Sequence, residues 1–558
     1  MRLNRRKALA LFGLGAAAAP AASLAAPYAG KVAFRHGVAS GDPLADRVIL
    51  WTRITPEDPA AQEIAYSWTL NPVDRRAGGA KSGSGVTDAG RDFTVKVDVS
   101  GLEPGRAYTY EFTVGGVTSP LGRTRTLPAG PTKDVVLAVA SCALYPGGYF
   151  NAYEAIARLP RVDAVLHLGD YIYEYAPEGY GYETGKQLNR LPDPPHDCVT
   201  LADYRRRHAC HRADAQLQAA HARAPWIVVW DDHETANDSY KDGAQHHDTA
   251  TDGDWNVRKA AAIKAYFEWM PIREPSDHGF AINRAFHFGD VASLFMLETR
   301  LTARDKQLTY DRDLTTGPDG KPDVAAFRAR LGDPGRRMMG ETQEAWLAEE
   351  LSASVRSGRP WQILGNEVVM ARVAIPSIRK GMDEQALAKA LAGLPAGAVR
   401  RIDRMESVAA LGLPYGLDMW DGYPADRDRL YGMIRKAKAN VVVVSGDSHA
   451  FWANELYDAP EGGNRVAVEF GATGITSPGA GDALPGVPVG EIFAKANREV
   501  VWSDQAAKGF VLLTLTKAGV TGQLMAVSTI MDRTYTTGVL KTFKATPGPE
   551  GVSGLTEA

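Results

Sequence analysis

Short apolar runs that end in polar clusters form the dominant pattern of this chain. Residues 441–444 are four valines, and Ser-Gly-Asp-Ser-His follows them directly. A run of this kind is typical of a strand that is buried on both faces. The same pattern recurs at residues 135–142, 165–170, 227–234 and 362–366. Because ligands of open α/β sheets bind at the carboxyl ends of the strands, we expect the polar residues after these five strands to share one edge of a sheet.

The patterning differs between about residues 31 and 128, where apolar and polar residues alternate in short segments bounded by turns. Strands are predicted at residues 48–52, 64–68, 93–97 and 108–114. Alternation with many β-branched and aromatic residues favours a β-sandwich. Residues 101–105, followed by Tyr108, resemble the Gly-Leu-x-Pro turn of fibronectin type III domains. We therefore predict that residues 31–128 form a fibronectin type III-like β-sandwich.

Beyond a Pro- and Gly-containing linker at residues 127–131, apolar strands alternate with segments of helical pattern. Helices are predicted at residues 151–159, 202–222, 255–269 and 343–357. Alternation of strands and helices predicts an α/β domain, residues 133–530, whose sheet is layered by helices. Residues 531–558 are assigned to a C-terminal tail. Its part after about residue 545 is rich in Pro, Gly and Glu and is predicted to be disordered.

The first 26 residues are predicted to be a signal peptide and not part of the fold. Arg5 and Arg6 precede an Ala-rich stretch, residues 8–19, and a small-x-small pattern at residues 23–25. This arrangement resembles a twin-arginine export signal, although Asn4 stands where Ser or Thr is commoner, and a general secretory signal is the alternative. No later run reaches the ~18 apolar residues that a membrane span needs. We expect a soluble periplasmic or secreted protein, with no membrane anchor after cleavage.

Composition narrows the possible functions. The 558 residues carry a net charge of only −3 and no basic stripe, so no nucleic-acid-binding surface is predicted. Of the three cysteines, Cys198 and Cys210 either form a disulfide in an oxidising compartment or remain free. Cys142 stands at a strand end beside polar residues. It is either a thiolate metal ligand or a small buried apolar side chain.

The residues at the strand ends are of metal-ligand types. Gly169 allows a sharp turn before Asp170, whose carboxylate can bridge two cations. Three residues later Tyr173 offers a phenolate, a hard anionic donor that suits ferric iron. Taken alone, the motif would fit an Asx turn beside a core tyrosine better than a metal site. The recurrence of ligand types at the other strand ends favours a metal site.

Two further clusters offer complementary ligands. Asp232 and Asn237 carry oxygen donors for a hard divalent ion, and His233 between them remains available as an acid or to orient a phosphate oxygen. Asp447 and His449 are two residues apart, so in an extended backbone both side chains point the same way. Together, the clusters predict a metal-dependent hydrolase.

The order of these motifs resembles that of the calcineurin-like metallophosphoesterases. The blocks are Cys142, Asp170-x-x-Tyr173, Asp232-His233-Glu234, Asn366 and Asp447-x-His449. With Cys in the first block and Tyr in the second, they are similar to the version found in PhoD-type alkaline phosphatases. Residues 37–43, 297–300 and 418–423 also resemble blocks of that family, although Glu298 stands where Asp is commoner. The block around Asn366 lacks the Gln that is common there, so its role stays open.

The resemblance implies a binuclear site and a reaction. Fe3+ would be held by Cys142, Asp170, Tyr173 and His449, and Ca2+ by Asp170, Asp232, Asn237 and Asp447. It implies hydrolysis of small-molecule phosphate monoesters by a metal-bound hydroxide. His233 and Arg300 would steady the phosphoryl group or the leaving oxygen. The alternatives are a phosphodiesterase or phospholipase D-like hydrolase on the same metals, and a non-catalytic secreted binding protein whose sandwich docks a wall polymer.

Overall fold

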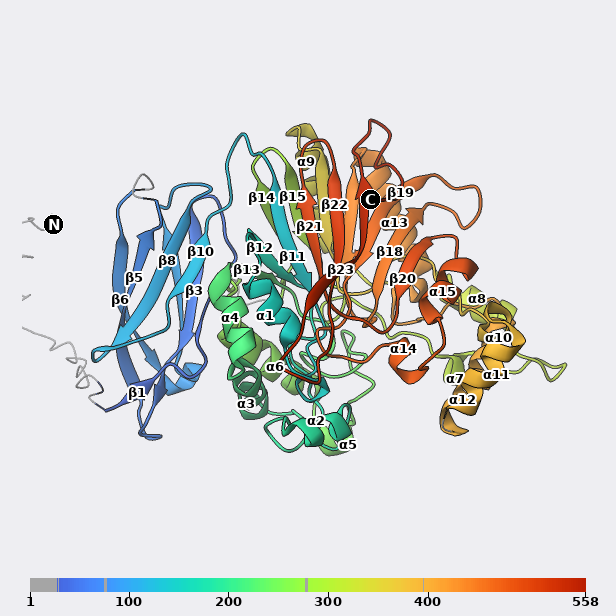
Figure 1. Cartoon of the computed structure of the whole chain (residues 1–558), viewed down its shortest axis with the longest axis horizontal. Helices are drawn as coiled ribbons and strands as arrows, with labels where there is room; N and C mark the ends of the chain where they lie inside the picture. The colour runs from blue at the N-terminus through green and yellow to red at the C-terminus, as the bar shows by residue number, and fades with distance from the viewer. Residues whose placement is uncertain (1–27, 29, 75–77, 276–279, 395) are drawn as a thin grey trace, which may run out of the picture.

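The computed structural model describes the chain except for residues 1–27, 29, 75–77, 276–279 and 395, so the predicted signal peptide lies outside the described residues. From one end of the molecule to the other, an N-terminal pair of facing sheets is followed by a larger body of sheets and helices (Figure 1). Each helix in the described residues is too short or too polar to cross a membrane.

The N-terminal region consists of two sheets that share one apolar core. The first sheet contains β5 (Glu63–Pro72), β6 (Lys81–Asp88), β8 (Ala107–Val114), β9 (Val117–Thr118) and β10 (Gly122–Arg125). The strands opposite are β2 (Val38–Gly41), β3 (Arg47–Arg53) and β7 (Thr94–Ser100). Val48 and Leu50 from one sheet pack with Tyr110 and Phe112 from the other. The alternating sequence therefore places one face of each strand in this core, and all four strands expected here are present.

The second of these N-terminal sheets continues into the larger body. β2 pairs in parallel with β13 (Trp226–Val228), which makes β2, β3 and β7 one end of a ten-stranded sheet. Gly41 sits at this junction, where a Cβ would lie 2.1 Å from the carbonyl oxygen of Pro271 and 2.7 Å from that of Trp226. Only glycine allows the two backbones to approach so closely.

The five predicted core strands are divided between two sheets, which corrects the expectation of a single sheet. β11 (Val135–Ala140), β12 (Ala164–His167) and β13 run parallel within the ten-stranded sheet. β16 (Trp361–Gly365) and β17 (Val441–Ser445) run parallel within a second sheet of seven strands. The other strands of that sheet are β14 (Arg284–Phe288), β15 (Ala292–Met296), β18 (Phe451–Tyr457), β19 (Arg465–Gly471) and β20 (Val500–Asp504).

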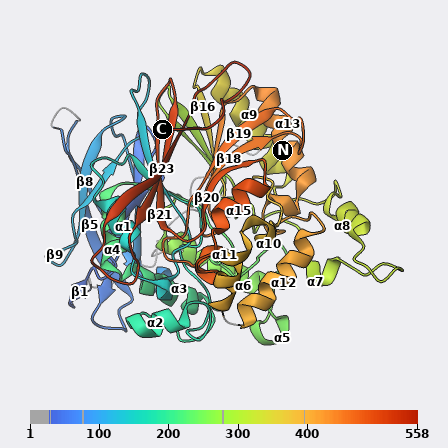
Figure 2. The same cartoon turned by 45° about the vertical axis from the view of Figure 1, so that its right-hand side comes forward.

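The two sheets pack face to face, and helices cover their outer faces (Figures 1 and 2). Val442 and Val444 belong to the core between the sheets, whereas Val441 and Val443 pack under the helices of the outer layer. Successive side chains of a strand point to opposite faces, so a run of four valines is needed when both faces are covered. The core is therefore a four-layered arrangement of helices, sheet, sheet and helices.

The outer helices lie close to their predicted positions. The principal helices are α1 (Asn151–Ala157), α2 (Tyr182–Leu188), α3 (Leu201–Arg212), α4 (Ala215–Arg223), α6 (Trp255–Trp269), α9 (Glu341–Arg356), α13 (Pro424–Ala437) and α15 (Val489–Ala496). The single helix predicted at residues 202–222 is two helices, because Asp214 caps a new start by accepting from the peptide N–H groups of Gln216 and Leu217. Three more, α10 (Ile378–Gly381), α11 (Glu384–Ala392) and α12 (Ala396–Ala409), form an outlying group beside α15.

The prediction of a disordered C-terminal tail is wrong. β23 (Thr537–Ala545) pairs along its length with β22 (Val520–Val527), which itself pairs with β21 (Lys508–Leu515). β24 (Thr556–Glu557) adds to the edge of β23. Beyond residue 545, where disorder was predicted, Val552 is buried in the core between the sheets, so the end of the chain is part of the fold.

The structure also decides between the two states that the sequence left open for the cysteines. Cys198 and Cys210 are both free thiols, and Cys198 is buried in the core next to the start of α3. Cys142 is free and fully buried.

Candidate metal centre

Strand ends from both sheets meet at one place. Cys142 follows β11, Asp170 follows β12, and Asp232 follows β13, while Asp447 and His449 follow β17 of the other sheet. Two close backbone approaches hold the sheets together at this edge. Ser141 forms a parallel bridge with Gly474, and a Cβ on Gly446 would lie 2.2 Å from the hydroxyl of Ser141. The strand ends predicted to share one edge therefore do converge, but from two sheets.

The side chains form three overlapping sets in which all ligand atoms of a set lie within 4.8 Å of one another. The sets are Cys142, Asp170 and His449; Asp170, Asp232 and His233; and Asp231, Asp232 and Asp447. Asp170 belongs to the first two sets and Asp232 to the last two. The described residues therefore place all the predicted Cys, Asp and His ligands in one continuous cluster. Asp231 is an addition that the analysis of the sequence missed, although it stands next to Asp232.

Tyr173 lies within the first set. Its hydroxyl donates to Oδ2 of Asp170 at 2.9 Å and lies 3.3 Å from Nε2 of His449. On the other ring nitrogen, Nδ1 of His449 lies 2.9 Å from the carbonyl oxygen of Pro478. A carbonyl accepts the Nδ1 proton, so this contact leaves the lone pair of Nε2 directed at the cluster.

The backbone is strained at four of these positions. Cys142, Asp170, Asp447 and His449 have φ values of 59°, 55°, 59° and 56°. Positive φ is uncommon for residues other than glycine and costs of order 1–3 kcal/mol at each position. Such strain persists only where the surrounding structure holds it, and it often gathers at functional sites. At Gly169, with φ of 99°, a Cβ would lie 2.3 Å from Cβ of Asp231, so no larger residue fits.

The cluster is rich in buried negative charge that the protein itself does not satisfy. Oδ1 of Asp170 and Oδ2 of Asp231 are buried without a hydrogen-bond partner among the described residues. Burial and neighbouring carboxylates raise the pKa of Asp231 and of Asp447 well above the usual range. Burial, followed by the charge of Asp170, likewise raises the pKa of the Cys142 thiol. These donors fit cations, because a bound cation would stabilise each of these groups in its ionised form.

His233 is held in place by a buried carboxylate that the sequence did not reveal. Oε2 of Glu174 lies 2.7 Å from Nδ1 of His233, and Oε1 lies 2.8 Å from Nδ1 of His246. The Glu174 side chain is wholly buried, and its Oε1 also accepts from the peptide N–H of Asn237 at 2.8 Å. Burial opposes ionisation of Glu174, but the charges of His233 and His246 lower its pKa overall. The only sequence signal is its place one residue after Tyr173.

The pKa of His233 is shifted in the matching direction. Burial disfavours the imidazolium, but the negative charges of Asp232, Glu174 and Asp170 raise the pKa well above its usual value. The ring of Tyr173 lies 4.2 Å from that of His233. With Nδ1 engaged by Glu174, the Nε2 side of the ring faces the cluster.

Arg300 occupies a different position from the predicted one. Its side chain is fully buried; it donates to three carboxylates and lies 4.0 Å from a fourth, that of Asp232. Nε donates to Asp231, Nη1 to Asp418 at 2.6 Å, and Nη2 to Asp447 at 3.3 Å. In the structure the guanidinium is engaged by these carboxylates, so Arg300 holds the acidic cluster together. Asp418, which also accepts from Arg304 at 2.5 Å, had no predicted role.

Asn237 and Asn366 differ in which of their side-chain atoms already have hydrogen-bond partners. Asn237 ends the turn that begins at Asp232, and its Nδ2 donates to Gln245 at 3.0 Å, which leaves its side-chain oxygen for a cation. Asn366 is fully buried, accepts from Nε1 of Trp420 at 3.0 Å and donates to the carbonyl of Val368. Each polar atom of Asn366 has one hydrogen-bond partner within the protein, and these bonds fix its side chain beside Trp420.

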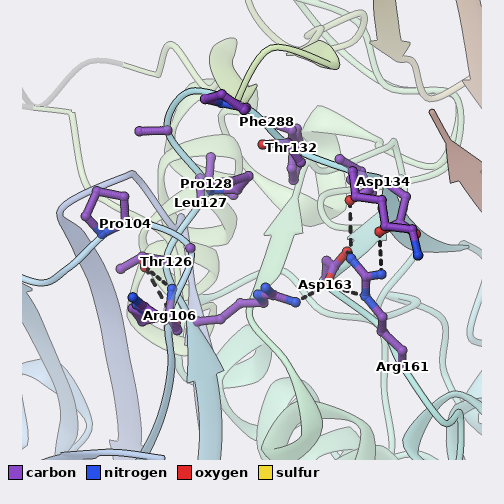
Figure 3. A pocket seen from close by; sticks show the side chains of 16 residues that line it. Pro104, Arg106, Thr126, Leu127, Pro128, Thr132, Asp134, Arg161, Asp163 and Phe288 are labelled. Atoms are coloured by element: carbon purple, nitrogen blue, oxygen red, sulfur yellow. Dashed lines mark hydrogen bonds and ion pairs between the residues drawn. The ribbon is translucent and has the colours of Figure 1, made fainter. Parts of the chain in front are cut away.

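A cavity of about 330 Å³ lies elsewhere, beside the linker between the N-terminal region and the core (Figure 3). Its charged groups pair with one another: Arg161 contacts Asp134 at 2.5 Å and Asp163 at 2.8 Å, and Arg125 also contacts Asp163. Since these charges are already neutralised and no metal-ligand cluster lines it, this cavity is no alternative to the metal centre.

Comparison with known proteins agrees with the geometry. The PhoD-like phosphatase family model matches residues 137–524, and the model of the PhoD-like phosphatase N-terminal domain matches residues 17–128. Alkaline phosphatase D of Bacillus subtilis (strain 168) is 35% identical over 471 residues, which cover 82% of this chain and 72% of that protein. A solved structure described as the structure of PhoD aligns with a TM-score of 0.76 and 30% identity, over 94% of this chain and 92% of the other. The resemblance predicted from the motifs is thus confirmed, and the chain is an enzyme of the PhoD-like phosphatase family.

Proposed function

We propose that this protein is an exported, metal-dependent phosphatase that hydrolyses phosphate monoesters. The observation that carries the proposal is the cluster of buried anionic donors at the convergent strand ends, with Oδ1 of Asp170 and Oδ2 of Asp231 lacking any partner in the described part of the chain. The family membership supports the reaction class. Buried anionic donors of this kind suit cations, and bound cations are a means of phosphoryl transfer.

The donor types divide into two kinds of site. Cys142, Asp170, Tyr173 and His449 would hold Fe3+, since a thiol and a phenol together suit iron. Asp170, Asp232, Asn237 and Asp447 would hold Ca2+, which prefers oxygen donors. When bound, such cations supply Lewis acidity that offsets charge on the phosphoryl oxygens.

The remaining residues act through position and proton transfer. Glu174 fixes the ring of His233 through Nδ1, which leaves Nε2 to donate a proton to the leaving oxygen of a bound ester. Arg300 keeps Asp231, Asp418 and Asp447 at fixed separations. The arrangement of two sheets between helix layers supports a metallophosphoesterase core, and the facing N-terminal sheets support a fibronectin type III-like domain.

The direct test combines metal analysis with turnover. Protein purified without added metal is expected to contain iron and calcium. Cys142→Ala is expected to lose iron, and Asp170→Asn both metals, with kcat/KM on p-nitrophenyl phosphate falling at least about a hundredfold. Cys210→Ala is the matched control and is expected to keep both metals and full activity, because Cys210 lies outside the cluster. Full turnover in both cluster variants would falsify the proposal, and preference for bis(p-nitrophenyl) phosphate would replace monoesters with diesters.

Export rests on the N-terminal sequence alone. The basic start with Arg5 and Arg6, followed by an apolar stretch, supports a periplasmic or secreted location by the twin-arginine route. Changing both arginines to lysine is expected to retain the full-length precursor inside the cell. Continued export of the double variant would favour the general secretory route.

A further inference from the structure

An apolar cavity of about 180 Å³ lies between the outlying helices α10 and α12 and the pair formed by α15 and α14 (Ala480–Ala483). Its walls include Ile378, Ile402, Tyr415, Ala480, Ile492 and Phe493. In Figures 1 and 2 the outlying helices lie beside α15, on the part of the molecule that carries the second sheet. The mechanism described above uses none of these side chains.

The cavity adjoins the metal centre through the segment after His449. Pro478, whose carbonyl accepts from Nδ1 of His449 at 2.9 Å, is two residues before Ala480 in the cavity wall. A Cβ on Gly479 between them would lie 2.8 Å from the carbonyl oxygen of His449. The backbone that supports a candidate metal ligand therefore continues directly into the wall of the cavity.

A second connection comes from the aromatic residues. The ring of Phe493 packs edge-on against Trp452 at 5.4 Å between centroids, and the indole N–H of Trp452 donates to Ser448 at 2.8 Å. Ser448 stands between Asp447 and His449. On the other wall, Tyr415 packs against Phe493 at 4.8 Å, and burial followed by the charge of Asp447 raises the pKa of its phenol.

We propose that this cavity is a subsite for the apolar alcohol portion of a phosphate ester whose phosphoryl group lies at the metal centre. The lining is almost entirely hydrocarbon and aromatic, and among its side chains only the phenol of Tyr415 can hydrogen-bond a sugar or glycerol hydroxyl. Polar groups buried there without partners would be disfavoured. An engineered apolar cavity of about 150 Å³ binds benzene, so the volume suits a phenyl ring or a chain of roughly four to six carbons.

The substrate class follows from this chemistry: alkyl or aryl phosphates, in preference to esters of small polar alcohols. This inference rests on the proposed phosphatase function and specifies its substrate. Each methylene that enters the cavity is expected to raise kcat/KM about fourfold, the equivalent of about 0.8 kcal/mol.

The test compares hexyl phosphate with ethyl phosphate on the metal-loaded full-length enzyme. The hexyl ester has about four more methylenes than the ethyl ester, so the ratio of their kcat/KM values is expected to lie between about sixteenfold, if two enter the cavity, and about 250-fold, if all four do. Ala480→Phe fills the cavity and Met405→Glu adds a charge to its wall, and both are expected to bring the ratio close to one. Ala345→Phe makes the same addition on an exposed face of α9, away from the cavity, and is expected to keep the wild-type ratio.

Binding of hexylphosphonate and ethylphosphonate, measured by calorimetry, separates this inference from the proposed function. If neither ester is hydrolysed but hexylphosphonate binds more tightly, and Ala480→Phe removes the difference, the subsite stands and the phosphatase proposal fails. A wild-type ratio near one, or a ratio that both cavity variants leave unchanged, overturns the subsite while leaving phosphatase activity intact.

Discussion

Replacing Arg300 with methionine tests whether one buried guanidinium holds the acidic cluster together. Arg300 is fully buried and is shared by Asp231, Asp418 and Asp447, and Asp231 is itself wholly buried. Removing one partner of a buried ion pair costs about 3–5 kcal/mol, because the remaining charge is left uncompensated. Methionine has a similar length but no charge. In chelator-treated protein, we expect the free energy of unfolding to fall by roughly this amount.

Bound cations should reduce that loss, because they neutralise the same carboxylates. Urea unfolding of Arg300→Met, followed by tryptophan fluorescence with and without metal, is the measurement. Arg427→Met is the matched control: Arg427 is a buried arginine that pairs with Asp421 at 2.7 Å, outside the metal-ligand sets. Its loss of stability is expected to be the same in both conditions. A loss below about 1 kcal/mol for Arg300→Met, or one that metal does not change, would refute this account.

Three further changes address other features of the structure. Glu174→Gln weakens a charge-assisted hydrogen bond to His233 that is worth about 1.5–3 kcal/mol, so kcat is expected to fall roughly tenfold to a hundredfold while metal content, measured by elemental analysis, is unchanged. Burial and then the charge of Glu298 raise the pKa of Glu367 to about 8, from 4.5. The folded protein therefore holds a proton that the unfolded chain releases above about pH 4.5, and stability falls as the pH rises towards 8. Glutamine at position 367 does not titrate, so Glu367→Gln does not lose stability in this pH range. The free energy of unfolding of the variant minus that of wild type, measured with urea, should therefore increase by roughly a few kcal/mol between pH 5 and pH 8; no change would contradict the assigned burial. Ending the chain before residue 537 removes β23 and exposes the edge of β22, and we expect a lower melting temperature and aggregation, whereas an unchanged melting curve would show that these strands contribute nothing.

The sequence alone was sufficient for the five core strands, the four strands of the N-terminal region, four helical segments and the chemistry of the core strand ends. A run such as residues 441–444 predicts a strand without knowledge of the neighbouring strands, because four successive β-branched apolar residues are typical of a strand covered on both faces. The ligand types after these strands were equally visible, since Asp170, Asp232 and His449 follow the ends of apolar runs directly. The family resemblance came from the same local blocks, whose order is a property of the chain.

What the tertiary structure decided depends on partners that are distant in the sequence. Whether β16 joins the sheet of β11 or another sheet depends on which strands pair, and an apolar run satisfies either pairing. The burial of Arg300 among carboxylates and the contact of Glu174 with His233 join residues from separate elements, and no local pattern encodes them. The same holds for β23, a strand whose side chains are mostly exposed and whose hydrogen bonds come from β22. Local propensity determines which segments become strands. Long-range packing determines which charges are buried together, and therefore which residues can bind cations, which hold those ligands in position and which only stabilise the fold.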